Sequence, residues 1–202
     1  MEDPGPNIES LVFSMDQLIR QAEFWLRLYS QWSRMEALRL PQRGLVALPP
    51  WFGDTFREMQ WLQLHDNRLR ALPESFGQLV DLRTLGLGNN QLTRLPETFG
   101  QLVALDDLGL ERNHLTTLPE TFGQLVRLQF LYLHNNDLTR LPDSCGVLVR
   151  LEVLDLSCNL LSTVPESIGD LEALMDLDLE NNRLEPSSRR VWIRNPGARV
   201  RW

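Results

Sequence analysis

The residues best suited to chemistry in this sequence recur at multiples of one spacing. Asp155 and Asp178 are 23 residues apart, and His65 and His134 are 69 residues apart. A pair of carboxylates can serve a glycosidase or bind calcium, and histidines are common metal ligands. Whether any of these groups can act together depends on the elements that position them.

Composition limits the function classes that the chain can belong to. Its 202 residues, 43% of them hydrophobic, are enough to bury the core of one domain, and no apolar run is long enough to span a membrane. A formal charge of −7 argues against general affinity for nucleic acid or anionic lipid. All basic residues are arginine, so no lysine can form a Schiff base or a P-loop. With no signal-peptide pattern and only two cysteines, we expect a cytoplasmic protein, or one delivered into a host cell.

Internal repetition decides the architecture, because the motif L-P-x-x-F-G recurs along the chain. Its copies are LPPWFG (48–53), LPESFG (72–77), LPETFG (95–100), LPETFG (118–123), LPDSCG (141–146) and VPESIG (164–169). Successive prolines are 23 residues apart, except for a first interval of 24. Between the copies runs a second motif, L-x-x-L-x-L-x-x-N-x-L, which is degenerate at 35–45 and carries a leading methionine at 59–69.

The second motif predicts seven strands. Alternating leucines indicate a strand with one buried face, and a period of 23 residues returns the next strand beside the previous one. No single turn can bury its leucines alone, so stacking of the turns must supply the core. We also expect a second buried column on the opposite side of the turns, with one member per turn, namely Phe52, Phe76, Phe99, Phe122, Cys145 and Ile168.

These motifs resemble those of the leucine-rich repeat family over residues 35–185. The L-P-x-x-F-G-x-L-x-x-L form is similar to the 23-residue intracellular repeats of plant and some bacterial proteins. The resemblance implies an α/β fold, a right-handed solenoid with a parallel sheet of about seven strands on its concave face. It also implies binding of a partner in general, and it names no ligand.

An asparagine occupies the turn after each strand. A side-chain amide there can donate to and accept from backbone groups that would otherwise be buried unpaired, so we interpret this column as structural. Its members are Asn67, Asn90, Asn113, Asn136, Asn159 and Asn182.

The two ends of such a solenoid need covering. In residues 1–34 hydrophobic side chains recur at intervals of three and four, which predicts an N-terminal capping helix. Its stretch FWLRLYSQW (24–32) also resembles the helical cap of bacterial effector ubiquitin ligases, whose repeats are shorter. Residues 186–202 carry five arginines and no acid around Val191, Trp192 and Ile193. We expect a cap with solvated arginines there, the alternative being a basic arm that binds acidic partners.

Residues at the third, fifth and seventh positions of the second motif point outward and form what we call the concave face. Side by side they predict a shallow trough with aromatic walls and a bare floor of glycines, followed by acids. The predicted partner-binding residues are Trp61, Gly86, Gly88, Gly109, Phe130, Tyr132, His134, Asp155 and Asp178. Aromatic anchors and glycine suit a closely approaching partner, and the acids suit a basic segment. The alternative is a solvated sheet that tolerates mixed residues.

The same register argues against catalysis. His65 and His134 would lie three strands apart, roughly 14 Å, which is too far to share a metal ion. Asp155 and Asp178 would be about 5 Å apart, but an open sheet neither excludes water nor raises the pKa of an acid. Calcium binding by these acids stays an alternative. Cys158 lacks a nearby histidine. We predict no catalytic residue, no metal ligand and no cofactor.

The sequence therefore predicts a monomeric, non-catalytic module that binds a protein or peptide, with a basic segment opposite its acids. Two alternatives remain open. The chain could be the substrate-recognition domain of a larger bacterial effector or ubiquitin-ligase-like enzyme. It could also be a structural protein that associates with itself.

Overall fold

The computed structural model describes residues 35–186 and 194–202. The predicted N-terminal capping helix (1–34) and the predicted closing residues Val191, Trp192 and Ile193 lie outside the described residues. Within the described part, no helix is long and apolar enough to cross a bilayer.

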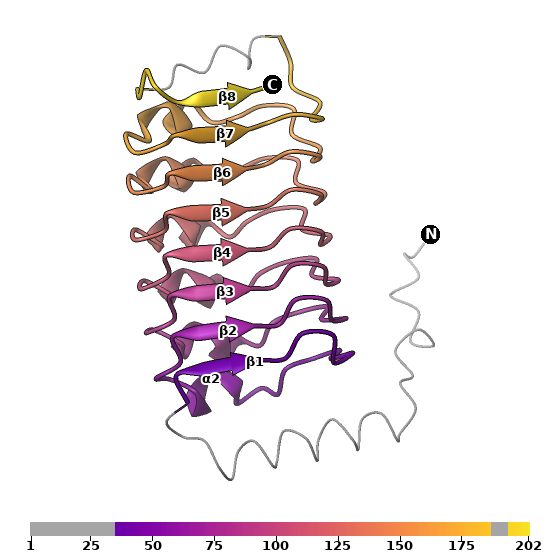
Figure 1. The fold of residues 1–202 in the computed structure, drawn as a ribbon. Helices are drawn as coiled ribbons and strands as arrows, with labels where there is room; N and C mark the ends of the chain where they lie inside the picture. Colours follow the sequence, from indigo (N-terminus) through magenta and orange to yellow (C-terminus); the bar gives the residue numbers. More distant parts are fainter. Residues whose placement is uncertain (1–34, 187–193) are drawn as a thin grey trace, which may run out of the picture. The chain divides into compact units, whose positions relative to one another are not determined.

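One parallel sheet of eight strands, paired in sequence order, runs through the described residues (Figure 1). Each strand is three residues long, with a buried central residue in most strands and side chains at its ends that face outward. The strands are β1 (Ala37–Arg39), β2 (Trp61–Gln63), β3 (Thr84–Gly86), β4 (Asp107–Gly109), β5 (Phe130–Tyr132), β6 (Val153–Asp155), β7 (Asp176–Asp178) and β8 (Arg199–Arg201). This arrangement is the α/β solenoid that the repeat predicts.

A short helical segment lies between successive strands up to β7, on the side of each turn away from the sheet (Figure 1). From η2 to η6 the segment follows the proline of the L-P-x-x-F-G motif, whose fixed φ and missing N–H suit the start of a helix. The segments are α2 (Phe52–Thr55), η2 (Glu74–Gln78), η3 (Glu97–Gln101), η4 (Glu120–Gln124), η5 (Asp143–Val147) and η6 (Glu166–Asp170).

A column of stacked phenylalanines fills the space beneath these helical segments. The ring centroids of Phe76 and Phe99 are 6.2 Å apart, as are those of Phe99 and Phe122, and the rings are nearly parallel. These side chains are fully buried, which confirms the second buried column. The column continues through Cys145, which is 4% exposed and has no ring, so the stack of aromatic rings ends there.

The glycine that follows each phenylalanine is explained by the contact between neighbouring turns. A Cβ atom at Gly100 would collide with the backbone carbonyl oxygen of Thr121 in the next turn. Glycine at this position therefore allows two turns to approach more closely than any side chain would permit.

The asparagine amides join each turn to the one before it. Asn113 Oδ1 accepts the backbone N–H of Leu92 at 3.0 Å, and Nδ2 donates to the carbonyls of Leu87 and Leu110 at 3.1 and 3.0 Å. Asn113 is 4% exposed, so water cannot easily replace these contacts. The same three contacts are made by Asn67, Asn90, Asn136, Asn159 and Asn182.

The eighth strand corrects the predicted count of seven. β8 lies 23 residues after β7, and its Val200 pairs in register with Leu177. The solvated arginines expected in residues 186–202 are also wrong for Arg201, which turns its side chain back onto the sheet. The last repeat was missed because Val200 replaces the central leucine and no leucine precedes it in the strand motif.

We expect Asn113→Ala to lower the free energy of unfolding by about 2–4 kcal/mol, because it leaves the buried N–H of Leu92 without a partner and removes one of the two amide donors to each of the Leu87 and Leu110 carbonyls. Asn182→Ala is the matched control. It removes the same three contacts, but Asn182 is only half-buried, so water can replace them and the loss should be about 1–2 kcal/mol. Urea unfolding measures both, and equal losses would contradict this account.

Candidate functional site

The strand register fixes which residues are neighbours on the concave face. In the fifth-position row, Gly86 pairs with Gly109, Gly109 with Tyr132, and Tyr132 with Asp155. The complete row is Arg39, Gln63, Gly86, Gly109, Tyr132, Asp155, Asp178 and Arg201. The third-position row is Ala37, Trp61, Thr84, Asp107, Phe130, Val153, Asp176 and Arg199.

The predicted aromatic residues lie on this face but form two separate groups. Trp61 is 55% exposed on β2, three strands away from β5. Phe130 and Tyr132 both lie on β5 and are half-buried, and His134 follows them at the seventh position. Phe130, Tyr132 and His134 are therefore contiguous. Trp61 is separated from them by the two strands that carry Gly86 and Gly109.

The glycine floor is not bare, which corrects the sequence interpretation. The Glu111 carboxylate lies where a Cβ atom of Gly88 would be, and its Oε2 would be 2.9 Å from a Cβ atom of Gly109. The Gln63 carboxamide covers Gly86 in the same way. The glycines thus make room for long side chains of this chain to lie flat against the sheet.

Asp178 is not available to a partner, which is a second correction. It is 7% exposed, and its Oδ2 is 2.9 Å from Nη1 of Arg201. Arg201 also donates from Nη2 to Oδ1 of Asp176 at 2.8 Å. The hydrogen bond to Asp176 is the main reason why the pKa of Arg201 is raised. Arg201 of β8 therefore pairs with both acids of β7 and offsets one of their two negative charges.

His134 and Asp155 lie side by side. His134 Nδ1 is 3.0 Å from Asp155 Oδ2, but the two atoms do not have the geometry of a hydrogen bond. The contact is an ion pair only when the imidazole is protonated. The other oxygen of Asp155 accepts the Ser157 hydroxyl at 2.7 Å. His65 contacts its own neighbour Asp66, at 2.9 Å.

A shallow pocket of about 300 Å³ lies between the two histidines. Its lining includes His65, Gly88, Glu111, Arg112 and His134. Even so, the described residues contain no group of three histidines, cysteines or acids placed to hold a metal ion.

Two acids that the sequence interpretation left out occupy the centre of the face. Burial, then the charge of Glu111, raises the pKa of Asp107. Burial raises the pKa of Tyr132, and the charges of Asp107, Asp155 and Glu111 add to that effect. Glu111 Oε2 is shielded from solvent and has no hydrogen-bond partner among the described residues. The sequence places Glu111 in the seventh-position row, two residues after Gly109 and 23 residues after Gly88. This position was the signal from which its contact with the glycines could have been predicted.

The two cysteines are free and separate. Burial raises the pKa of the Cys145 thiol to about 12, so this thiol stays protonated at neutral pH. Cys158 lies in the turn after β6, with φ of 55°, and accepts a contact from Asn181 Nδ2 at 3.6 Å. Neither thiol is placed as an activated nucleophile would be.

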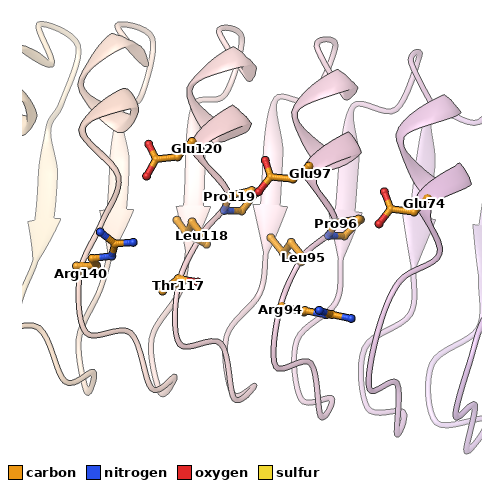
Figure 2. A pocket seen from close by; sticks show the side chains of 10 residues that line it. All are labelled: Glu74, Arg94, Leu95, Pro96, Glu97, Thr117, Leu118, Pro119, Glu120 and Arg140. Atoms are coloured by element: carbon orange, nitrogen blue, oxygen red, sulfur yellow. The ribbon is translucent and has the colours of Figure 1, made fainter.

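A second groove of about 400 Å³ lies away from the sheet (Figure 2). Glu74, Glu97 and Glu120 follow the prolines of successive turns and form one side, while Arg94 and Arg140 come from the segments before the prolines. These walls come from repeated motif positions, so the groove follows from the periodicity of the turns.

The fold and its column of asparagine amides define a class of protein, namely solenoids built from short leucine-bearing turns around a parallel sheet. Family models described as leucine-rich repeat match residues 95–138, 127–184 and 81–102. The chain belongs to the leucine-rich repeat family.

Solved structures agree with this assignment. A leucine-rich repeat protein of Leptospira interrogans is 28% identical with a TM-score of 0.61, covering 84% of this chain and 49% of its own. The PEPR1–AtPEP1 structure is 31% identical with a TM-score of 0.71, and the corresponding shares are 81% and 24%. The plant peptide hormone receptor RGFR1 in complex with RGF2 is 26% identical with a TM-score of 0.64, with shares of 79% and 31%.

The chain thus spans about half of the Leptospira protein and a quarter to a third of the other two chains. No curated protein matches it in a sequence comparison.

We expect Asp107→Asn to lower the pKa of Tyr132, because a nearby carboxylate disfavours the phenolate. Tyr29 is the only other tyrosine, so a Tyr29→Phe background leaves one phenol to titrate by its ultraviolet absorbance. Asp81→Asn, an exposed acid that is not among the charges acting on Tyr132, is the control. An unchanged titration curve in Asp107→Asn would contradict the electrostatic coupling.

Proposed function

We propose that the chain is a non-catalytic interaction module that binds a protein or peptide on its concave face. The observation that carries the proposal is the centre of this face, where half-buried Phe130 and Tyr132 stand beside Asp107 and Glu111, two acids without a cationic partner among the described residues. Aromatic residues on a rigid sheet lose little conformational freedom on binding, and they contribute most of the energy of many interfaces.

The similar structures support a peptide or protein as the kind of partner. RGFR1 is a plant peptide hormone receptor whose structure contains RGF2, and PEPR1 was solved with AtPEP1. Proteins of this family typically act as interaction modules, and an open sheet offers little of the water exclusion that catalysis needs.

We place the partner's basic segment opposite the middle of the sheet, and not opposite the acids of β7. Asp176 and Asp178 are already paired with Arg201, so a basic segment of the partner would have to compete with this arginine for them. Asp107, Glu111 and Asp155 are the acids that a basic segment would meet. Their effect should be on orientation and association rate more than on affinity.

Two other functions stay predictions. One is a substrate-recognition role within a larger bacterial effector or ubiquitin-ligase-like enzyme, and the other is self-association as a structural protein. The cytoplasmic location and the monomeric state also stay predictions.

We expect Tyr132→Ala to weaken partner binding at least tenfold, because a half-buried aromatic residue at the centre of an interface is a typical hot spot. The midpoint of thermal unfolding should change little, since the side chain lies on the concave face and not in the core. Affinity capture from an extract of the source organism, quantified for the parent and the variant, measures the effect.

Val126→Ala is the matched control, because Val126 is 49% exposed and is not part of the concave rows. Binding that is reduced equally by both substitutions would place the partner elsewhere. Binding unchanged in Tyr132→Ala would refute the concave site.

A further inference from the structure

Two of the three histidines lie in the seventh-position row of the concave face, and both line the shallow pocket of about 300 Å³. The side chains of His65 and His134 are 40% and 27% exposed, so solvent reaches both rings. Asp66 Oδ2 is 2.9 Å from His65 Nδ1, and Asp155 Oδ2 is 3.0 Å from His134 Nδ1. Each imidazole therefore has a carboxylate placed to pair with it once it is protonated.

Both of these carboxylates also accept hydrogen bonds from other groups. Hydrogen bonds from Asn89, then from His65, lower the pKa of Asp66, so this acid stays ionised in mildly acidic solution. Asp155 Oδ1 accepts the Ser157 hydroxyl at 2.7 Å, which leaves Oδ2 for His134. Since histidine ordinarily titrates well above aspartate, a fall in pH should protonate the two imidazoles before their acids.

The other charged residues of the pocket determine what this protonation does. Glu111 and Arg112, from the turn after β4, line the pocket together with Asp66. At neutral pH the lining thus carries two acids and one cation, and it is negative overall. Protonation of both histidines gives three cations against the same two acids. The charge of the pocket lining therefore changes sign in mildly acidic solution.

The neighbouring strands place further charged or titratable groups around the two histidines. Arg39 on β1 stays a cation, and burial raises the pKa of Tyr132 on β5, so its phenol stays neutral. Burial, then the charge of Glu111, raises the pKa of Asp107 on β4, so this acid is among the first carboxylates to lose charge as the pH falls. Asp107 adds to the response of the histidines, and a test has to separate the two contributions.

We propose that His65 and His134 make binding on the concave face sensitive to pH, so that a basic segment of the partner binds at neutral pH and binds more weakly in mildly acidic solution. This inference rests on the proposed function and adds its regulation. His134 follows Glu111 in the seventh-position row and contacts Asp155, which are two of the acids that a basic segment would meet. New positive charge there opposes the approach of a cation and lowers its association rate.

The test is a titration of the full chain with acetyl-tetra-arginine-amide at about pH 7.5 and at about pH 5.5, on either side of the usual histidine pKa. The backbone amide signals of Gly88 and Tyr132 in nuclear magnetic resonance spectra report binding at the concave face. Arginine stays charged at both pH values, so a change in affinity comes from the chain and not from the probe. We expect the dissociation constant to be about fivefold higher at the lower pH.

The double substitution His65→Gln/His134→Gln should reduce this ratio of dissociation constants to less than about twofold, because glutamine does not titrate. The ratio that remains reports the contribution of Asp107. His114→Gln is the matched control. His114 Nδ1 is also close to a carboxylate, 3.3 Å from Asp137 Oδ2, but it lies outside the rows of the concave face. This variant should keep the ratio of the parent.

Equal dissociation constants at the two pH values in the parent would overturn the proposal. A ratio that the double substitution leaves unchanged, or that His114→Gln abolishes, would overturn it too, as would absence of signal changes at Gly88 and Tyr132 up to the solubility limit of the probe. The capture experiment with Tyr132→Ala at neutral pH separates the two levels. If Tyr132 controls capture while the ratio does not depend on His65 and His134, the concave binding surface stands and only its pH dependence is refuted.

Discussion

The amide column is the interaction on which the rest of this structure depends. Each turn contributes only three residues to the sheet, so most backbone polar groups of a turn must find partners outside regular secondary structure. Asn113 and its counterparts supply these partners, since each one bonds to a backbone N–H and a carbonyl of the preceding turn and to a carbonyl of its own. The column therefore holds neighbouring turns in a fixed register.

That register determines which residues are neighbours on the concave face. Residues one period apart lie side by side, so Gly109 lies between Gly86 and Tyr132. Surface properties can then change abruptly from one turn to the next. Asp107 on β4 and Glu111 just after it have no ion-pair partner among the described residues, whereas both acids of β7 pair with Arg201.

Much of the fold could be predicted from the sequence because leucine and asparagine positions recur with a fixed spacing, and that spacing sets the position of each Cα atom. The placement of long side chains could not be predicted from this spacing. Glu111 and Gln63 fold over glycines of neighbouring turns, and their rotamers depend on space that the repeat pattern does not encode. The glycines were therefore interpreted as an open floor, although this chain fills it.

The state of Asp178 was missed for a different reason. Its partner Arg201 belongs to a turn that lacks the leucines by which the repeat is identified. Only the spacing of 23 residues between the two positions marks them as neighbours. A search by period alone, without regard to residue type, would have extended the sheet by one strand and paired the two side chains.

The end of the phenylalanine stack at Cys145 has a consequence for motion. Turns of a solenoid are coupled only to their neighbours, so a smaller interface weakens the cooperativity between the segments on its two sides. The turns from β6 onward are joined to the stacked turns through a thiol in place of a ring. Opening fluctuations should therefore pass less readily from the C-terminal turns into the stacked turns, which keeps the strands β3 to β5 in the most persistent part of the described residues.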